Sequence, residues 1–277
     1  MPIKRAAVIN DISCVGKCSL TVTIPILSAL GVEVCPVPTA VLSTHTEFPN
    51  PTFRNLSDDI KGIVNHWKTL GVPFDAVYSG YLAGEEQIDI VSAAFDTLDS
   101  AKLRLVDPVM GDSGFLYSKF SQDFPLYMRK LCKNADIIVP NITEISAMCE
   151  IPFHDGLYTE GEIEGLIEAM KIHTAAKMVL TGVELRKDEV GIAIWDGSTI
   201  SFYSNERICG RFSGTGDIFA SVLLGMLLNN RSLFESAISA ADFTGNCIRN
   251  TLRYENEQRF GVMFEDCLPS LYSSIQK

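Results

Sequence analysis

The feature that most constrains the fold is a repeated alternation of short β-branched runs with longer amphipathic segments. In one amphipathic segment, Ile163, Leu166, Ile167 and Met170 recur at helical spacing. Such alternation is typical of an α/β fold, with a mostly parallel sheet and helices on both faces. The predicted strands are Ala6–Asn10, Val32–Ala40, Ala76–Ser79, Leu103–Val106, Ile137–Val139 and Met178–Thr181. The predicted helices are Leu56–Leu70, Gln87–Leu98, Thr143–Cys149 and Thr159–His173.

A hairpin is expected in the later part of the chain. Val190–Trp195 and Thr199–Tyr203 are two strand-like runs joined by the turn-forming residues Asp196-Gly197-Ser198. This hairpin would add an antiparallel edge to the sheet. The sequence shows no internal repeat, linker or low-complexity block, so we expect residues 1–277 to form a single domain.

The composition excludes several classes of partner. With 23 Lys and Arg against 34 Asp and Glu, the formal charge is -11, which disfavours nucleic acid or an anionic membrane surface as the main partner. Uncharged stretches such as Cys18–Val32 are too short to span a membrane, and Met1–Asn10 lacks a signal-peptide core, so we expect a cytoplasmic protein. The 8 cysteines form no C-x-x-C pair, which favours free thiols over disulfides or zinc.

Polar residues stand where the predicted strands end. In open α/β sheets, ligands bind outside the carboxyl ends of the strands, so these positions are candidate site residues. They are Asp11, Ser79-Gly80-Tyr81, Asp107 to Asp112, Asn141 with Glu144, and Thr181-Gly182.

A glycine-rich turn opens the last long apolar run. Ser213-Gly214-Thr215-Gly216-Asp217 precedes Ile218–Leu228, which is long enough for a buried helix. Backbone N–H groups at the glycines and the helix N-terminus would form an anion hole suited to phosphate. Asp217 could then act as a general base toward a hydroxyl group. The alternative is an ordinary acidic residue in the first turn of a helix. Gly16-Lys17-Cys18 does not complete a Walker motif.

Asp107 and Glu144 follow adjacent predicted strands. Carboxylates placed in this way could hold hydrated Mg²⁺ between the protein and nucleotide phosphates. Taken singly, Asp107 could cap a turn and Glu144 could begin a helix. Together with the glycine-rich turn, they favour phosphoryl transfer.

As an ordered set, these motifs resemble the ribokinase superfamily and, more narrowly, the pyridoxal kinases. The set comprises Ser79-Gly80-Tyr81-Leu82, Asp107-Pro108-Val109-Met110-Gly111-Asp112, Pro140-Asn141-x-x-Glu144 and Gly214-Thr215-Gly216-Asp217. Ser43-Thr44-His45-Thr46 is similar to the Ser-Asn-His-Thr motif of the family, with Thr44 in place of Asn. The resemblance extends from Val8 to about Leu228.

The resemblance implies a ribokinase-like three-layer α/β/α sandwich, usually dimeric. It also implies transfer of the γ-phosphate of Mg-ATP to the 5′-hydroxymethyl group of pyridoxal, pyridoxamine or pyridoxine. Asp217 would be the base, and the amides of Gly214, Thr215 and Gly216 would hold the phosphoryl group. The implied ATP and magnesium residues are Asp107, Asp112, Asn141, Glu144, Thr181 and Tyr117, with Asp107 and Glu144 acting on the metal through water. The implied acceptor-site residues are Asp11, Thr46, Tyr81 and His45, although His45 could equally be a polar turn residue. The sequence leaves the need for a monovalent cation such as K⁺ open.

Two other functions stay open at this stage. Hydroxymethylpyrimidine (phosphate) kinases typically carry Cys at the position of Asp217, which favours the vitamin B6 interpretation. Asp11, however, replaces part of a Gln-Ser-His motif, and an acid there could bond either a pyridine 3-hydroxyl or an aminopyrimidine. A non-catalytic nucleotide-binding module is the third possibility, against which the intact motifs argue.

Four further side chains are weaker candidates for a role in the site. Cys14 and Cys209 could react with a substrate aldehyde, although free cysteines are more often inert. Lys17 and Arg211 could neutralise phosphate charge, although most such residues are solvated at the surface.

Overall fold

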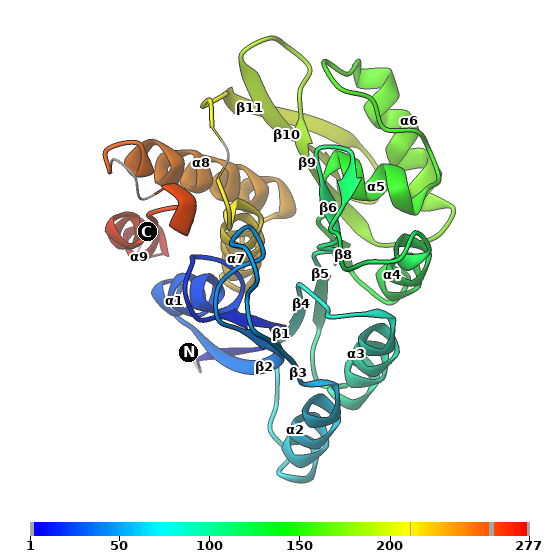
Figure 1. Cartoon of the computed structure of the whole chain (residues 1–277), viewed down its shortest axis with the longest axis vertical. Coiled ribbons are helices and arrows are strands. Elements are labelled where there is room, and N and C mark those ends of the chain that lie inside the picture. Colours follow the sequence, from blue (N-terminus) through cyan, green and yellow to red (C-terminus); the bar gives the residue numbers. More distant parts are fainter. Residues whose placement is uncertain (1–2, 211, 255–257, 276–277) are drawn as a thin grey trace.

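The computed structural model describes residues 3–210, 212–254 and 258–275, and a nine-stranded sheet runs through it (Figure 1). Six strands are parallel and include every strand predicted in the first part of the chain, and antiparallel strands flank them on both sides. The parallel strands, in sheet order, are β9 (Lys177–Val183), β8 (Ile137–Ile138), β5 (Leu103–Val106), β4 (Ala76–Ser79), β1 (Lys4–Ser13) and β2 (Val32–Leu42).

The two sheet edges differ in how far the sequence predicted them. The expected hairpin is confirmed as β10 (Glu189–Trp195) and β11 (Ile200–Glu206), which extend the sheet beyond β9. A second antiparallel edge, β3 (Phe53–Asn55), pairs with β2 and was not expected. Its three residues are all exposed, so its sequence lacks the alternation of apolar and polar residues that would predict a strand.

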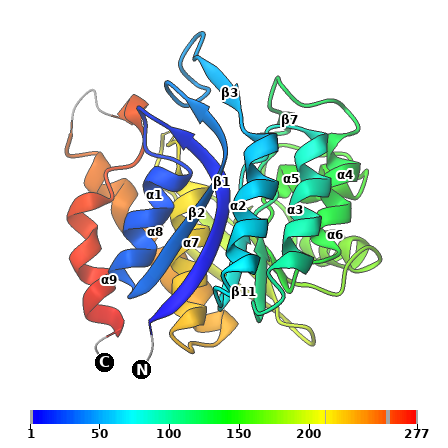
Figure 2. The ribbon, with the colours of Figure 1, turned by 90° about the horizontal axis from the view of Figure 1, so that it is seen from below.

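Helices cover both faces of the sheet, which confirms the three-layer sandwich (Figure 2). Alternate residues of β1 enter the two separate cores: Ala7 and Ile9 pack on one side, and Ala6 and Val8 on the other. One layer holds α2 (Ser57–Thr69), α3 (Glu85–Thr97), α4 (Phe124–Cys132), α5 (Ile142–Met148) and α6 (Glu160–Lys171). The other holds α1 (Leu20–Ala29), α7 (Thr215–Leu228), α8 (Leu233–Thr251) and α9 (Leu268–Ile275).

Helix α7 is the element that fixes the glycine-rich turn in space. It is uncharged beyond its first turn and packs against both α1 and α8. A Cβ atom at Gly225 would lie 2.3 Å from Leu30 Cδ1, so the two helices approach closely at this point. Because α7 is buried along nearly its whole length, its N-terminus is held in one position relative to the sheet.

The remaining elements were not predicted from periodicity. Helix α1 has no charged residue and contains Pro25, so it shows no amphipathic pattern. A small hairpin of β6 (Gly111–Asp112) and β7 (Phe115–Leu116) follows β5, and its strands are too short to recognise. Two 3₁₀ turns, η1 (Gln258–Phe260) and η2 (Glu265–Cys267), lead into α9. Within the described residues, no helix combines the length and hydropathy that a membrane crossing requires.

Candidate active site

The polar residues that follow the parallel strands meet the N-terminus of α7 at the carboxyl ends of those strands. Asn10 of β1 donates a hydrogen bond from Nδ2 to Asp217 Oδ1 at 3.1 Å, which joins the sheet directly to the first turn of α7. A Cβ atom built at Gly216 would lie 3.9 Å from Asp107 Oδ2. The structure therefore brings Asp107 and the glycine-rich turn together, although 106 or more residues separate them in the sequence.

The backbone at Gly214 has a conformation and a neighbour that only glycine accommodates. Its φ is +84°, and a Cβ atom there would lie 1.9 Å from the carbonyl oxygen of Lys17. Among the described residues, no acceptor is hydrogen-bonded to the backbone amides of Thr215, Gly216 or Asp217. These donors at the N-terminus of a buried helix form the anion hole that the sequence predicts.

Asp217 has the environment of a general base. Its side chain is half-buried, and burial, together with the nearby charge of Asp11, raises its pKa to about 6. The backbone N–H of Ser19 and the amide of Asn10 oppose this rise and favour the ionised form. At neutral pH the carboxylate is thus mostly ionised, yet its pKa lies close enough to neutrality for proton transfer.

Asn10 is a site residue that the sequence analysis missed. Its Oδ1 accepts hydrogen bonds from the backbone N–H groups of Asp11 (3.0 Å) and Tyr81 (2.9 Å). These two donors fix the amide orientation, so Nδ2 must point toward Asp217. The one signal in the sequence was a buried amide at the end of an otherwise apolar strand.

Asp11 is buried, and both of its carboxylate oxygens have partners within the protein. Ser13 Oγ donates to Oδ2 at 3.1 Å, and Ser19 Oγ donates to Oδ1. Burial raises the pKa of Asp11, while the two serine hydroxyls oppose the rise. In this arrangement Asp11 holds Ser19, whose backbone faces Asp217.

Asp107 and Glu144 form a buried acidic pair beneath the turn. Burial is the main reason that the pKa of each carboxyl is raised, and the charge of Glu144 adds to the effect on Asp107. Among the described residues, none donates a hydrogen bond to the Asp107 carboxylate, so a charge there has no partner within the protein.

Glu144 also has the local role that the sequence analysis weighed for it. It completes a capping box at the start of α5, accepting from the backbone N–H of Asn141 at 2.9 Å, while Asn141 Oδ1 accepts from the N–H of Glu144 at 2.9 Å. Its other oxygen accepts from the N–H of Met110 at 3.0 Å. Glu144 therefore orders the segment after β5 and places a second buried carboxyl group beside Asp107.

A magnesium ion fits the chemistry of this pair. The described residues contain no group of three or more His, Cys, Asp or Glu side chains that could hold a metal ion. Both carboxyls are nevertheless buried with raised pKa values, so a cation bound beside them would favour their ionised forms. Mg²⁺ commonly uses one or two carboxylates together with waters and phosphates, so this donor set suits it.

The hairpin of β6 and β7 carries the other predicted nucleotide-side residues. Asp112 is exposed on this hairpin, and Asn141 Nδ2 ties the hairpin to α5 through the carbonyl of Gly111 at 2.8 Å. Tyr117 follows the hairpin, and burial of its phenol beside Glu144 and Asp112 raises its pKa. Thr181 lies next to this group, because its N–H donates to the carbonyl of Pro140 at 2.9 Å.

On the proposed acceptor side, the side chains of Tyr81 and Thr46 are more accessible to a ligand than the buried side chain of His45. Burial raises the pKa of Tyr81 to about 12, and its ring lies 5.7 Å from that of Phe120. Thr46 is exposed. His45 is buried, with Nε2 3.0 Å from the carbonyl of Arg259 and Nδ1 accepting from the N–H of Glu47 at 3.3 Å. Both ring nitrogens thus have protein partners, as expected of a turn residue.

The weaker candidates lie at the surface or outside the described residues. Cys14 and Cys209 are exposed free thiols. Lys17 Nζ pairs with Glu265 at 2.6 Å instead of facing the anion hole. Arg211 lies outside the described residues.

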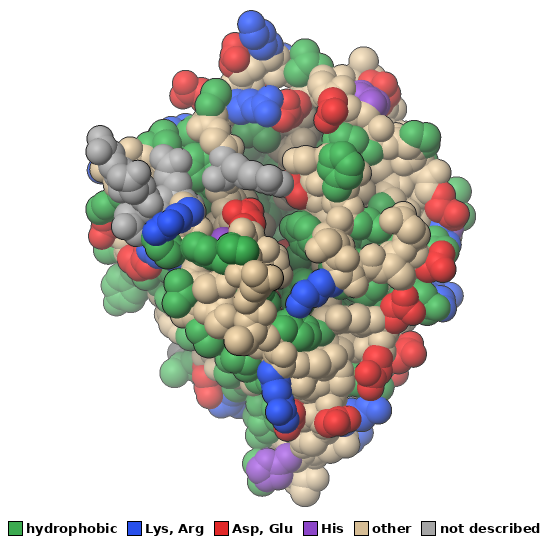
Figure 3. All heavy atoms as spheres, viewed as in Figure 1, with side chains coloured by type: hydrophobic (Ala, Val, Ile, Leu, Met, Phe, Trp, Pro, Cys, Tyr) green, Lys and Arg blue, Asp and Glu red, His purple; other side chains and the backbone are tan. Residues whose placement is uncertain are grey.

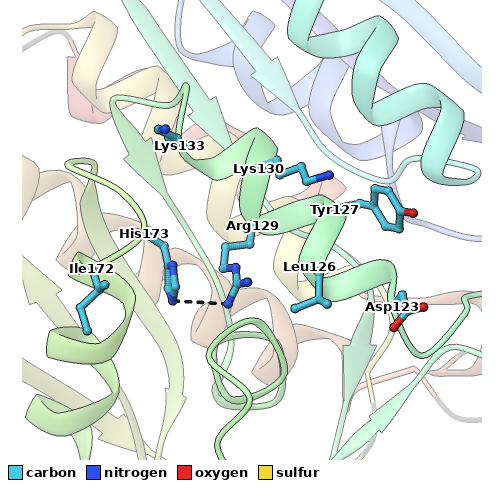
Figure 4. A pocket seen from close by; sticks show the side chains of 8 residues that line it. All are labelled: Asp123, Leu126, Tyr127, Arg129, Lys130, Lys133, Ile172 and His173. Atoms are coloured by element: carbon cyan, nitrogen blue, oxygen red, sulfur yellow. Dashed lines mark hydrogen bonds between the residues drawn. The ribbon is translucent and has the colours of Figure 1, made fainter.

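The space-filling view shows acidic side chains around a depression near the centre of this face (Figure 3). A separate hollow of about 640 Å³ runs along α4 to the end of α6 (Figure 4). There Arg129 donates to the carbonyl of Met148 at 2.9 Å and contacts His173, while Lys130 and Lys133 point in different directions. These basic groups do not converge on a common ligand, so we do not assign a site to this hollow.

Comparison with known proteins decides the family. Residues 24–261 match the model of the phosphomethylpyrimidine kinase family. The chain belongs to this family. It is 34% identical to a Bacteroides thetaiotaomicron member, provisionally described as a phosphomethylpyrimidine kinase and crystallised with pyridoxal; the match covers 97% of this chain and 96% of that one, with a TM-score of 0.92.

Other proteins that resemble this chain are named as pyridoxal kinases. The structure of pyridoxal kinase from Lactobacillus plantarum is 29% identical, covers 98% of each chain and has a TM-score of 0.91. Pyridoxal kinase PdxY of Corynebacterium diphtheriae is 25% identical over 270 residues, which are 91% of each chain. These matches confirm the predicted kinase family and its fold.

Proposed function

We propose that the protein transfers the γ-phosphate of Mg-ATP to the 5′-hydroxymethyl group of pyridoxal, pyridoxamine or pyridoxine. The observation that carries this proposal is the placement of Asp217 beside backbone amides of the glycine-rich turn that have no acceptor among the described residues. A carboxylate next to an anion hole suits transfer of a phosphoryl group to an alcohol. The pyridoxal in the Bacteroides structure and the names of the other two relatives support the choice of acceptor.

In the proposed reaction the acceptor hydroxyl oxygen attacks the γ-phosphorus as the bond to the leaving oxygen of ADP breaks. The carboxylate of Asp217 takes the hydroxyl proton. Amides of Gly214, Thr215 and Gly216 hold the transferring group and stabilise its developing charge. Mg²⁺, when bound near Asp107 and through water near Glu144, would neutralise phosphate charge. Asn10 keeps the carboxylate of Asp217 oriented throughout.

We assign the other site residues to either the nucleotide or the acceptor. Asp112, Asn141, Thr181 and Tyr117 are proposed to lie along the nucleotide. Thr46 and Tyr81 are proposed to contact the pyridine ring of the acceptor. Asp11 and His45 are proposed to shape the acceptor side, and their hydrogen bonds support a role in holding neighbouring residues.

A hydroxymethylpyrimidine (phosphate) kinase is the second candidate, favoured by the family description and by the acid at position 11. Initial rates of ATP consumption with pyridoxal, pyridoxamine, pyridoxine and hydroxymethylpyrimidine would separate the two. We expect kcat/KM for one of the B6 vitamers to exceed that for the pyrimidine by about tenfold or more. A faster reaction with the pyrimidine would replace the proposed acceptor. No ATP consumption with any of these alcohols would favour a non-catalytic nucleotide-binding module.

The raised pKa of Asp217 predicts an acid limit on activity. Because the base must be ionised, kcat/KM should fall about tenfold for each pH unit below about 6. The measurement is a pH profile of kcat/KM, corrected for the separately measured titration of acceptor and nucleotide. A rate that stays constant from pH 7 to pH 5 would exclude this carboxyl as the base.

Replacing Asp107 should change the magnesium dependence of the rate. We expect Asp107→Asn to raise the Mg²⁺ concentration for half-maximal rate by about tenfold, because it removes a buried charge beside the phosphates. Asp123→Asn, an exposed acid in the distant hollow, is the control and should leave this concentration unchanged. An equal magnesium dependence in the wild type and Asp107→Asn would remove Asp107 from the proposed magnesium site.

We propose three further features on the basis of the sequence and its resemblance to the pyridoxal kinases. They are a cytoplasmic location, a homodimer, and the organisation of residues 1–277 as one domain. The nine-stranded sheet, which includes strands from β1 to β11 and leaves out β6 and β7, supports the last of these.

A further inference from the structure

A segment near the C-terminus, Arg259–Met263, joins three loops of the candidate site. The carbonyl of Phe260 accepts from the N–H of Lys17 at 2.7 Å, in the loop after β1. The N–H of Val262 donates to the carbonyl of Ser213 at 3.3 Å, directly before the glycine-rich turn. The carbonyl of Arg259 lies 3.0 Å from His45 Nε2, in the loop after β2. One short segment therefore connects the turn to the loop that carries the proposed acceptor contacts.

The connection is close-packed at its centre. Gly261 has φ +101°, and a Cβ atom there would lie 2.9 Å from both the Cβ and the carbonyl oxygen of Lys17. A Cβ atom at Gly16 would lie 2.1 Å from His45 Cδ2. These contacts leave no room for the loops to slide past one another.

The same segment is anchored to the helical layer behind it. Met263 N–H donates to Thr251 Oγ1 at 2.8 Å, and Asn250 Nδ2 donates to the Met263 carbonyl at 3.1 Å. Through α8, which packs on α7, the segment and the glycine-rich turn share one support.

Two aromatic contacts extend this support to the loop after β2. The ring of Phe260 lies 5.5 Å from that of Phe48, and Phe48 lies 4.8 Å from the ring of His45. Both phenylalanines are half-buried, whereas Thr46, between His45 and Phe48 in the chain, is exposed. These tilted aromatic contacts thus hold the ends of a short loop whose middle faces outward.

We propose that Phe260 is a positioning residue for the alcohol acceptor, acting through Phe48 and His45 on the loop that presents Thr46. This inference rests on the proposed kinase function. Apart from the glycine-rich turn, the proposed nucleotide residues follow β5, β8 and β9, whereas the ring of Phe260 contacts Phe48 in the loop after β2. The segment reaches Ser213 through the backbone N–H of Val262, which a change of the Phe260 side chain does not remove. Loss of the Phe260 ring should therefore weaken acceptor binding and leave nucleotide binding unchanged.

The test compares Phe260→Ala with Phe260→Tyr and with a matched control, Phe234→Ala, at an exposed position at the start of α8. The acceptor is whichever alcohol the wild-type enzyme phosphorylates fastest. We expect Phe260→Ala to raise KM for the acceptor about tenfold, with KM for ATP and kcat within twofold of wild type. Phe260→Tyr should restore the acceptor KM, and Phe234→Ala should behave as wild type.

Acceptor binding measured by calorimetry without nucleotide, on protein whose melting curve shows that it is folded, gives a second readout. Equal increases in KM for both substrates would show a merely structural role and overturn the proposal, as would an unchanged acceptor KM and affinity. If Phe260→Ala does not fold, Phe260→Leu replaces it under the same criteria. Failure of the wild type to phosphorylate any B6 vitamer would count against the proposed function and not against this inference, which is then tested on the alcohol that is accepted.

Discussion

Replacement of Asp217 by asparagine is expected to lower kcat by about 10²- to 10⁴-fold, the usual contribution of a general base. The amide oxygen of D217N can still accept the hydrogen bond from Asn10, so the local geometry should persist while the basic group is lost. ATP binding should stay near that of the wild type, because the amides of the turn are unchanged. The measurement is steady-state kinetics with calorimetric nucleotide binding. A kcat within threefold of wild type would remove Asp217 as the base.

The same substitution should make the unliganded protein more stable. The pKa of Asp217 is raised from 3.8 to about 6 on folding, so the ionised carboxylate costs free energy in the folded state above pH 6. The cost is on the order of 1–2 kcal/mol once partial solvent screening is allowed for. D217N should thus raise the melting temperature at pH 7.5 by a few degrees, and the gain should vanish as the pH falls toward 4.

Asp89→Asn, an exposed acid on α3, is the control for this stability effect and should leave the melting temperature unchanged. An inactive D217N protein that is also less stable than wild type at pH 7.5 would indicate that the substitution disturbs the fold. The kinetic result could not then be assigned to loss of the base.

Gly214→Ala is expected to damage both the anion hole and the fold. The added Cβ atom would meet the carbonyl oxygen of Lys17 at 1.9 Å, and alanine disfavours the φ of +84°. The turn must move, and misplaced oxyanion donors typically cost about 10²- to 10³-fold in kcat. Strain of this kind is worth on the order of 1–3 kcal/mol, so the free energy of unfolding should also fall.

Gly165→Ala provides a matched control for the Gly214 substitution. Gly165 lies inside α6, where an added Cβ atom meets nothing within 4 Å. Alanine there should raise the free energy of unfolding by about 0.5–1 kcal/mol without changing kcat. Urea unfolding and steady-state kinetics on both variants give the comparison. A Gly214→Ala enzyme with wild-type rate and stability would contradict the close contact with Lys17.

The class of fold was predictable because the parallel strands and helices α2, α3, α5 and α6 show a hydrophobic pattern in the sequence. Ala6–Asn10 is buried on both faces, as expected of a parallel strand between two helical layers. Helices α4 and α8 were not predicted although their buried residues recur at helical spacing, and two other elements lack such a pattern. Helix α1 is uncharged along its length, and β3 is a short exposed edge. Helix α1 packs against α7 and α9, which are distant in sequence, whereas β3 is placed by pairing with the nearby strand β2.

The candidate site was also predicted only in part from the sequence. The rule that ligands bind at strand ends identified Asp107 and Asn141, and the structure places them at the same edge of the sheet as Asp217. Asn10 could not be assigned, because its partner Asp217 is 207 positions away. The contact of His45 with Arg259 was hidden for the same reason, since their separation is 214 residues. The fold brings these distant residues together, and the pattern of neighbouring residues in the sequence does not predict such contacts.

The most direct test of the central claim is a crystal structure of D217N with Mg-ATP and pyridoxal, since the inactive enzyme should retain both substrates. We predict that the γ-phosphate lies on the amides of Gly214, Thr215 and Gly216. We also predict that the 5′-hydroxyl lies within hydrogen-bond distance of the side chain at position 217. A γ-phosphate bound away from this turn, or a side chain at position 217 that faces away from the acceptor, would contradict the account.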